Sequence, residues 1–379
     1  MKSGLKGIKR LVIISLLALT IVWILAGIAL NVAFLDPISR IVEDFKFSDV
    51  YYQILQETDE PDVSCDITIV DMSELYNRRD LARAMHEIDS LKPRTIGVDI
   101  VFEGLKEDSL GDEMIRDVAL KMKRAVFSYR MLDFKNDSTG YALAVHSFFA
   151  DSLAVDEGYV NVRRELYGGL KRELSTKARC KGSWQLSFVS KLVGVYTGCD
   201  NEEKKPSVMS INFSPTEFPM VSADSVSSHP ELIRDRLVLF GAISDENDSH
   251  YTPLGKMSGV ELLAYSVQTL LERNDVCEIP WWAVVLFSFL LVFLTEWWLY
   301  CYSVWASNMR NRGVGLFFSN SITKGILLFL WMIIVVWVMF IVFFKYNVSV
   351  PLGWSLSAMA FLEMARNFYD ECINAFNRK

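Results

Sequence analysis

Residues 67–102 of this chain, ITIVDMSELYNRRDLARAMHEIDSLKPRTIGVDIVF, decide the fold of its central part. Two short, mainly β-branched runs, 67–70 and 95–102, enclose a stretch in which apolar residues recur at helical spacing until Pro93. The order strand, helix, strand is that of a βαβ unit. Near-continuous apolar strands of this kind indicate a sheet that is covered on both faces.

The alternation of strands and helices continues toward the C-terminus. A polar loop interrupts it at residues 133–140, and Gly158 begins another turn that leads into a strand. The periodicity predicts, besides the βαβ unit, helices over residues 37–56, 112–123, 184–196 and 260–271 and strands over 125–131, 209–213 and 236–240. We therefore predict an α/β fold with a mostly parallel sheet and helices on both faces.

The two ends of the chain are far more apolar than its middle. The chain is 51% hydrophobic and 22% charged, a mixture that fits neither an ordinary soluble domain nor a pure membrane bundle. Residues 11–35, 281–302 and 325–344 reach the roughly 20 residues that a membrane-spanning helix needs. Residues 348–364 are weaker, because proline, glycine and serine dilute them, so they either span the membrane or rest at its interface.

Basic residues set the expected orientation. If the fourth segment spans, the lysines before residue 11, the basic loop around Arg310 and the basic tail after residue 365 are all cytoplasmic, as the positive-inside rule requires. We therefore predict a multi-pass protein of the inner (plasma) membrane with one N-terminal span and three C-terminal spans, or two if the fourth segment does not cross. The predicted segments are a cytoplasmic N-terminus 1–10, a transmembrane helix 11–35, an extracytoplasmic domain 36–279 in the periplasm or extracellular space, a transmembrane helix 280–302, a cytoplasmic loop 303–324, transmembrane helices 325–345 and 348–365, and a cytoplasmic tail 366–379.

Two features of the apolar segments can be interpreted in more than one way. Residues 11–35 could be a cleaved signal peptide, but their apolar run is longer than the core of such peptides, which favours a retained anchor. Glu296 lies inside the second segment, where a carboxylate is costly in lipid unless it faces another helix or reaches the interface.

Charge and cysteine content narrow the class of protein. The formal net charge of −7, without a basic stripe interleaved with aromatic residues, argues against nucleic acid as a partner. The six cysteines contain no CxxC pair and no spacing typical of a zinc site. In an oxidising compartment Cys180 could pair with Cys199, or Cys65 with Cys277, and free thiols are the alternative.

Several short stretches, taken in order and with the membrane segments around them, resemble the type-two CHASE domain. This family is a sensory extracytoplasmic module found with adenylate cyclases, histidine kinases and serine/threonine kinases. The resemblance covers about residues 37–275. The matching stretches are ITIVD at 67–71, KPRTIGVDIVF at 92–102, GYVN at 158–161, INF at 211–213, LVLFGA at 237–242, DSHYTPL at 248–254 and GVE at 259–261.

The resemblance implies a sensory input domain held outside the cytoplasm. Members of the family usually carry a cytoplasmic output domain after the last span, whereas here only about fifteen residues follow it. The resemblance therefore implies a separate effector protein, cytoplasmic or in the membrane, besides the lipid bilayer itself. It leaves a homodimer open, and it predicts no enzymatic activity for this chain.

Candidate ligand-binding residues follow the predicted strands. Asp71 and Asp99 lie at or near the carboxyl ends of two strands, where open α/β sheets place their ligand crevice. A third strand leads to Asp248, His250 and Thr252, so the same edge could collect three carboxylates and an imidazole. A further candidate, offered as a bidentate partner for an anionic ligand, is Arg163.

These candidates allow several functions. The carboxylates and imidazole could bind a divalent cation or supply acid and base groups, or they could only cap turns and helices. No GxSxG, HExxH, P-loop or dinucleotide fingerprint occurs, and neither a cofactor nor a metal is identifiable. We therefore predict a sensory protein that signals to a separate effector. The alternatives are a membrane scaffold that recruits a partner and an extracytoplasmic metal-dependent enzyme.

Overall fold

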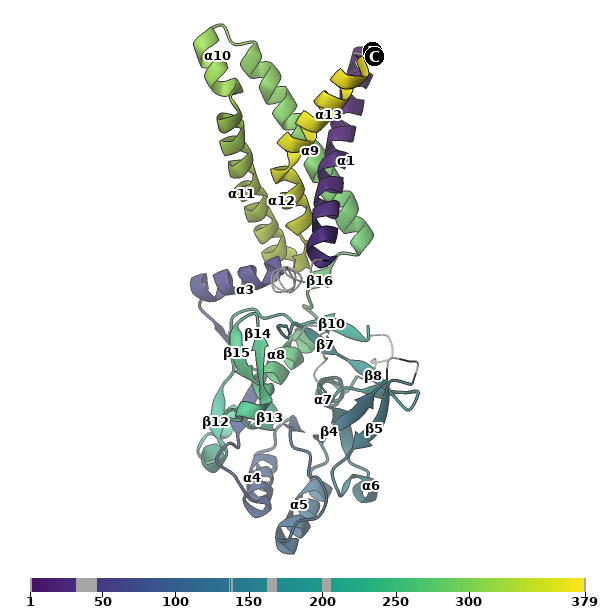
Figure 1. The fold of residues 1–379 in the computed structure, drawn as a ribbon. Helices are drawn as coiled ribbons and strands as arrows, with labels where there is room; N and C mark the ends of the chain where they lie inside the picture. Colours follow the sequence, from purple (N-terminus) through teal and green to yellow (C-terminus); the bar gives the residue numbers. More distant parts are fainter. Residues whose placement is uncertain are drawn as a thin grey trace. The chain divides into compact units, whose positions relative to one another are not determined.

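The structure is a computed structural model, and its elements fall into two compact units. One unit comprises Tyr52–Val276, and the other combines Met1–Tyr51 with Cys277–Lys379. The first is an α/β domain and the second is a bundle of helices (Figure 1). The residues described are 2–31, 46–135, 137, 139–161, 169–199 and 206–377.

The α/β domain follows helix α3 (Phe47–Thr58), which crosses the division between the two units. Its further helices are α4 (Arg78–Ser90), α5 (Ser109–Lys121), α6 (Ala150–Leu153), α7 (Phe188–Thr197) and α8 (Gly259–Glu272). Its strands are β1 (Asp62–Val63), β2 (Ile67–Asp71), β3 (Thr95–Val98), β4 (Ala125–Phe134), β5 (Tyr141–Val145), β6 (Asp156–Tyr159), β7 (Glu173–Ser175), β8 (Lys177–Cys180), β9 (Ser183–Leu186), β10 (Val208–Ser210), β11 (Thr216–Glu217), β12 (Met220–Ser222), β13 (Leu237–Gly241), β14 (Ser249–Thr252) and β15 (Gly255–Ser258). The sequence-based expectation of a mixed α/β domain is confirmed.

The main sheet has the strand order β12-β2-β13-β3-β4-β5-β8-β9, with β6 paired to β4. The pairs from β12 to β4 and the β4/β6 pair are parallel, whereas β4/β5 and β8/β9 are antiparallel. Gly241 lies opposite Asp71, and Phe240 lies opposite Val98. The carboxyl ends of β2, β13 and β3 therefore meet at one edge, because parallel neighbours run in the same direction.

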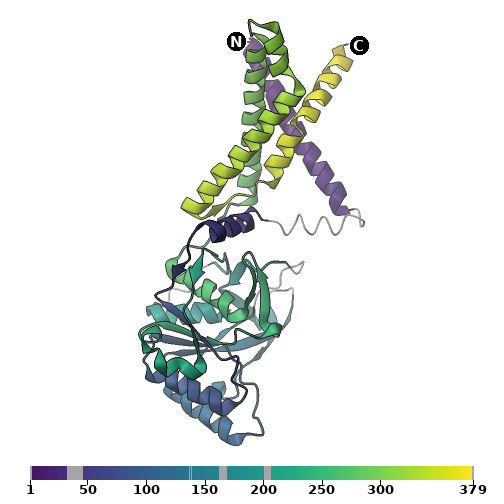
Figure 2. The same cartoon turned by 90° about the vertical axis from the view of Figure 1, so that its left-hand side faces the viewer.

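Alternating side chains of the strands bury both faces of this sheet. Ile96 and Val98 belong to the apolar cluster that also contains residues of α4 and α5. Gly97 faces the other way, where an added Cβ would lie 2.9 Å from side-chain carbons of Phe188 and Leu192 on α7. The period of two along a strand thus places α4 and α5 on one face and α7 on the other. Figure 2 shows α4 and α5, in blue, on one side of the sheet.

Several predicted boundaries are wrong: the strand predicted over 95–102 ends at Val98, and two further boundaries differ because of tertiary contacts. The predicted helix 184–196 begins with strand β9, because this segment pairs antiparallel with β8; α7 starts only after Ser187, whose Oγ accepts a hydrogen bond from the Ser190 N–H at 3.2 Å. The predicted strand 209–213 ends at Ser210. The backbone N–H of Asn212 instead donates to Thr269 Oγ1 of α8 at 3.0 Å.

The second unit is built mainly from long helices. Its elements are α1 (Lys2–Asn31), β16 (Cys277–Glu278), α9 (Trp281–Ser307), α10 (Arg312–Ser319), α11 (Ser321–Tyr346), β17 (Val348–Ser349), α12 (Gly353–Ala360) and α13 (Leu362–Asn377). Within the described residues three helices are long and apolar enough to cross a membrane, at Gly7–Gly27, Trp281–Ser307 and Ser321–Tyr346. The fourth span, predicted at 348–365, coincides with α12 and the start of α13 and stays a prediction.

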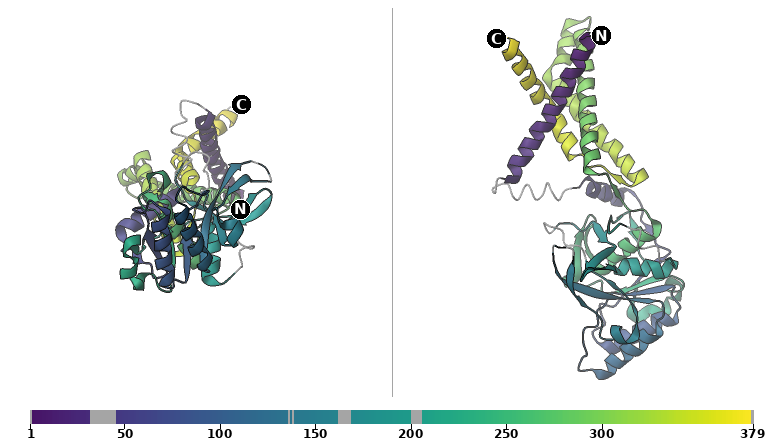
Figure 3. Two further views of the ribbon diagram at one scale, coloured as in Figure 1. Left: turned by 90° about the horizontal axis from the view of Figure 1, so that it is seen from below. Right: turned by 90° about the vertical axis from the view of Figure 1, so that its right-hand side faces the viewer.

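The helices of this unit bring the two ends of the chain together. Figure 1 and the right-hand view of Figure 3 show the N-terminus of α1 and the C-terminus of α13 at one end of the bundle. Glu296 on α9 accepts hydrogen bonds from Arg366 on α13, so of the two alternatives the structure has the one in which this carboxylate faces another helix. All six cysteines of the chain are described, and each is a free thiol, in line with the alternative to disulfide pairing.

Candidate ligand-binding cleft

A cleft of about 460 Å³ lies beside the carboxyl end of β3. It combines charged and polar groups with apolar side chains of α8 and of the segments that follow β3 and β6, and its volume is in the usual range for small-molecule sites. Its lining residues are Asp99, Ile100, Val101, Ser128, Arg130, Val160, Asp245, Asn247, Asp248, His250, Gly259, Leu262 and Leu263. Three of the residues singled out in the sequence, Asp99, Asp248 and His250, therefore meet in one place.

Asp99 is the most perturbed acid of the cleft. Its backbone N–H donates to the carbonyl of Phe240 at 2.9 Å, which fixes the residue directly after β3. The residue is partly exposed and lines the cleft. The pKa of Asp99 is raised to about 7, mainly because the charged form loses solvation and also because the Asp248 carboxylate is near, while His250 partly offsets the rise. Within the described part of the chain no group donates a hydrogen bond to this carboxylate.

Two further polar atoms in the cleft have no hydrogen-bond partner among the described residues. Ser128 on β4 exposes 1% of its surface, and its Oγ is unpaired. His250 on β14 has a buried Nε2 that lies 3.4 Å from Asp248 Oδ1 without the geometry of a hydrogen bond. Leaving buried polar groups unpaired costs free energy, so these atoms mark where a ligand could supply the missing partners.

Asp248 is held against the start of α8. An added Cβ at Gly259 would lie 2.2 Å from Asp248 Oδ2, so only glycine leaves room for this carboxylate. Gly259 is the first residue of α8, after the capping residue Ser258. The Asp248 carboxylate therefore lies beside the N-terminus of α8.

The cleft also contains one guanidinium group. Arg130, two residues beyond Ser128 on β4, makes an ion pair with Glu103 on the surface of the domain. Against this paired cation stand the carboxyl groups of Asp99, Asp245 and Asp248. The balance of charge suits a ligand that donates hydrogen bonds or carries a positive charge.

Asp71, in contrast, is turned away into a loop connection. Its Oδ1 accepts hydrogen bonds from the Ser73 backbone N–H at 3.0 Å and from the Ile243 N–H at 3.1 Å. Ser73 Oγ in turn accepts from the N–H groups of Ile243 and Ser244. Asp71 therefore ties the loop after β2 to the loop after β13, as a turn-forming aspartate does, and it does not line the cleft.

Thr252, another candidate from the sequence, does not line the cleft either. Thr252 is 2% exposed, and its Oγ donates to the Gly255 carbonyl at 2.9 Å inside the β14/β15 hairpin. Arg163 lies outside the described residues. Ser128 and Arg130 were missed in the sequence, although a serine and an arginine in the otherwise apolar strand 125–131 are a signal that could have pointed to them.

The geometry does not favour a metal site. Within the described residues no group of three or more His, Cys, Asp or Glu side chains is arranged to hold a metal ion. Asp248 and His250 approach each other, but Asp99 reaches them only through longer-range electrostatic interaction. The cleft is better suited to hydrogen bonding with an organic solute than to coordination.

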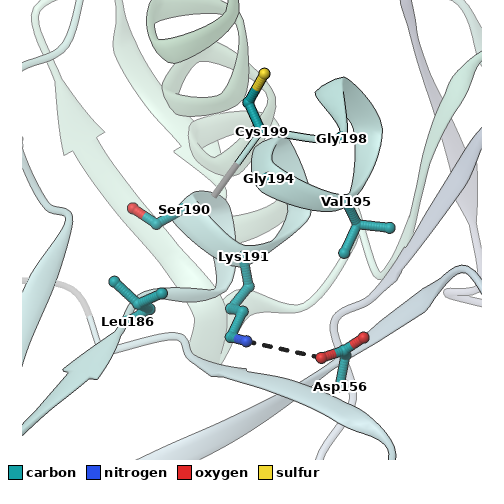
Figure 4. A pocket seen from close by; sticks show the side chains of 8 residues that line it. All are labelled: Asp156, Leu186, Ser190, Lys191, Gly194, Val195, Gly198 and Cys199. Carbon is teal, nitrogen blue, oxygen red and sulfur yellow. Dashed lines mark ion pairs between the residues drawn. The ribbon is translucent and has the colours of Figure 1, made fainter. Parts of the chain in front are cut away.

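A second hollow, of about 320 Å³, lies along α7 (Figure 4). Lys191 and Asp156 form an ion pair across it at 3.7 Å, drawn as a dashed line. Ser190 contributes a buried Oγ that has no partner among the described residues. This hollow has one unpaired polar atom and a paired charge, whereas the cleft at Asp99 has two unpaired atoms and a carboxyl group that titrates near neutral pH. The cleft is therefore the stronger candidate.

Comparison with models of known protein families shows which family the chain belongs to. The model of the CHASE2 domain family matches residues 16–297, and the chain belongs to this family. CHASE2 is a family of extracytoplasmic sensory domains, which agrees with the α/β domain and the apolar helices that flank it. Searches among curated proteins and among solved structures found no match.

Proposed function

We propose that this chain is a multi-pass sensory protein of the inner (plasma) membrane whose α/β domain lies in the periplasm or extracellular space. In this proposal the domain binds a small solute in the Asp99 cleft and passes the signal to a separate effector protein. The effector acts in the membrane or the cytoplasm. The observation that carries the proposal is the partly buried Asp99 carboxyl group, which accepts no hydrogen bond from the described residues and shares a cleft of ligand size with two unpaired polar atoms.

The charge distribution of the helix bundle supports this orientation. Arg10, Lys324 and Arg366 line one pocket of the bundle, Lys9 directly precedes Arg10, and Arg310 lies in the connection between α9 and α10. Basic residues concentrate on the cytoplasmic side of membrane proteins. The α/β domain is inserted between the opposite ends of α1 and α9, so a cytoplasmic location of the basic end puts the domain on the other side.

The ligand we propose is a small solute with several hydrogen-bond donors, including cationic solutes. Asp99 and His250 would accept hydrogen bonds from it, and the Ser128 hydroxyl would complete the set. Side chains of Leu262 and Leu263 on α8 would contact its apolar part. An unpaired site of this kind gains most from a ligand that supplies the partners missing in the empty cleft.

The chain offers a covalent route from the cleft to the membrane. Helix α8 lines the cleft with its first residues, and the chain continues from its end at Glu272 to the start of α9 at Trp281. A ligand that binds two arrangements of α8 with different affinity would shift the population of those arrangements. In this proposal α9 transmits the shift to the other helices of the bundle and thereby to the effector.

The ligand arm of the test uses the full chain in lipid nanodiscs. Amino acids, polyamines and sugars are screened one at a time for a rise in the melting temperature of the protein. We expect at least one solute to stabilise the wild type and not Asp99→Asn, whereas Asp117→Asn, which changes an exposed aspartate on α5, keeps the effect. Stabilisation that persists in Asp99→Asn would contradict binding in this cleft.

The effector arm uses a photo-crosslinking amino acid at Phe376, an exposed position near the end of α13. In native membranes we expect it to capture a distinct protein, and the yield should change in Asp99→Asn but not in Asp117→Asn. If the crosslinking yield were the same in the wild type, Asp99→Asn and Asp117→Asn, signalling through the cleft would be contradicted. The chain would then fit a scaffold that only recruits a partner.

A further inference from the structure

The basic end of the helix bundle contains a polar pocket of about 340 Å³ between four helices. It is distinct from the cleft of the α/β domain, and every residue in its lining belongs to the helical unit. The lining residues are Arg10 and Leu11 of α1, Glu296, Tyr300, Ser303, Val304 and Ser307 of α9, Lys324 of α11 and Arg366 of α13.

Two ion pairs hold the helices around this pocket. Arg366 donates from Nε and Nη2 to the two oxygens of Glu296, at 3.2 and 2.6 Å, and Glu296 is 2% exposed. Arg10 donates from Nη2 to both oxygens of Asp370, at 2.9 and 2.8 Å. The Arg366–Glu296 pair is bidentate, with two donor nitrogens, which fixes the orientation of that guanidinium group. Helix α13 is thereby tied to α1 on one side and to α9 on the other.

After these pairs are formed, positive charge remains in the pocket. Lys324 has no carboxylate partner within the part of the chain that the structure describes. The Nε of Arg10 is buried and has no hydrogen-bond acceptor among those residues. Three basic side chains and one carboxylate line the pocket, so an anion that accepts hydrogen bonds would satisfy both Lys324 and Arg10.

The residues near the pocket indicate that the anion belongs to a lipid. Val304, which lines the pocket, and Ile326, two residues after the lining residue Lys324, expose 42% and 57% of their surface and belong to two of the helices apolar enough to cross a membrane. Trp305, 54% exposed, lies one residue beyond Val304, at a place typical of the belt at lipid headgroup level. A phosphate that enters this pocket would therefore have acyl chains beside exposed apolar side chains.

We infer that this pocket binds the phosphate of an anionic phospholipid. Basic pockets between transmembrane helices are suited to such headgroups, because a fixed cation meets the phosphate where the acyl chains can remain in the bilayer. A lipid phosphate between Lys324 and Arg10 joins α11 to α1. The inference is independent of the ligand proposed for the cleft at Asp99.

The test measures lipid binding to the full chain by native mass spectrometry, with phosphatidylglycerol and phosphatidylcholine in competition. We expect the wild type to retain phosphatidylglycerol preferentially. We expect Lys324→Ala to bind it about fivefold more weakly, which corresponds to roughly 1 kcal/mol for one lysine near a lipid phosphate. Lys324→Arg keeps the charge and should keep the preference.

Lys345→Ala is the matched control, because Lys345 lies at the other end of the same helix, with its ammonium 5.6 Å from the ring centre of Tyr346. It should bind phosphatidylglycerol as the wild type does. Equal binding of the two lipids, or an equal loss in Lys324→Ala and Lys345→Ala, would overturn the inference. Inorganic phosphate that displaces phosphatidylglycerol at comparable concentration would also overturn it, because the pocket would then be a site for a free anion.

Discussion

Two carboxyl groups of the α/β domain, Asp112 and Asp99, have opposite environments. The Asp112 carboxylate accepts hydrogen bonds from the guanidinium of Arg78 and from the backbone N–H of Lys106, the latter at 2.8 Å. Burial by itself raises the pKa of Asp112, but these hydrogen bonds and the charge of Arg78 outweigh it, so the pKa is lowered. Asp99 has no such partner, and its pKa is raised to about 7.

The difference separates a structural acid from a candidate binding group. The Asp112 pair joins α5 to α4, and the guanidinium of Arg78 also lies over the ring of Phe148, 5.0 Å from its centre. The partly buried Asp99 carboxyl group makes no hydrogen bond with the described residues that would join two elements. Acids of the second kind are concentrated at functional sites, where a ligand supplies the partner.

The largest effect is expected at the paired acid. Arg78→Met leaves Asp112 buried without its guanidinium, and the free energy of opening α4 and α5 should fall by about 3 kcal/mol. This is the lower end of the range for buried pairs, because Asp112 exposes only 5% of its surface but lies in the outer layer of the domain. Hydrogen exchange of the full chain in nanodiscs, followed on peptides of α4 and α5, measures this change.

Arg83→Met is the control for this prediction. Arg83 pairs with Asp80 at 3.0 Å on the surface of the same helix, with side chains 65% and 38% exposed. Removing an exposed pair should cost less than about 1 kcal/mol. If both variants lost the same amount, the Asp112 pair would not be the structural tie described above. In Arg78→Met/Asp112→Leu most of the loss should be recovered.

The next effect is a pH dependence that belongs to Asp99. Its pKa is about 7 in the folded chain and 3.8 ordinarily, so in this window the unfolded chain releases a proton that the folded chain keeps. Stability should therefore fall as the pH rises from about 4 to about 7 and stay level above that. At pH 8 Asp99→Asn should be more stable than the wild type by roughly 2 kcal/mol, about half of the full shift, because the cleft admits water.

The melting temperature of the full chain in nanodiscs, measured from pH 4.5 to 8, tests this prediction. The difference between Asp99→Asn and the wild type should widen with pH. The same difference for Asp117→Asn should remain constant, because that aspartate is exposed. A constant difference for Asp99→Asn as well would mean that the Asp99 carboxyl group is already solvated or paired.

The smallest effect distinguishes two buried serines. Ser187 caps α7 by accepting the Ser190 N–H, so Ser187→Ala should cost about 1 kcal/mol. Ser128 Oγ has no partner among the described residues, so Ser128→Ala should change stability by less than about 0.5 kcal/mol or raise it. Chemical unfolding of the two variants provides the comparison. An equal loss would indicate that Ser128 is a structural residue rather than a binding group.

Most of the framework could be predicted from the sequence. The apolar runs that became α1, α9 and α11 are read directly, because a helix long enough to span a bilayer needs an uninterrupted apolar stretch. The pair Asp99 and His250 was also accessible, since both follow strands whose carboxyl ends meet at one edge. The boundaries of β9 and β10 were not, because long-range pairing outweighed local periodicity there.

The sequence by itself determined the class of this protein, a CHASE2 chain with an α/β domain between apolar helices, because strand and helix periods and apolar length are local properties. Only the tertiary structure decided which side chains meet. Asp71 and Asp99 look equivalent in the sequence. In the structure, Asp71 accepts a hydrogen bond from the Ile243 N–H in the loop after β13, whereas Asp99 lines the cleft together with Ser128. Strand register and the alternation of side chains between the two faces determine that outcome, and both depend on pairing between segments far apart in the chain.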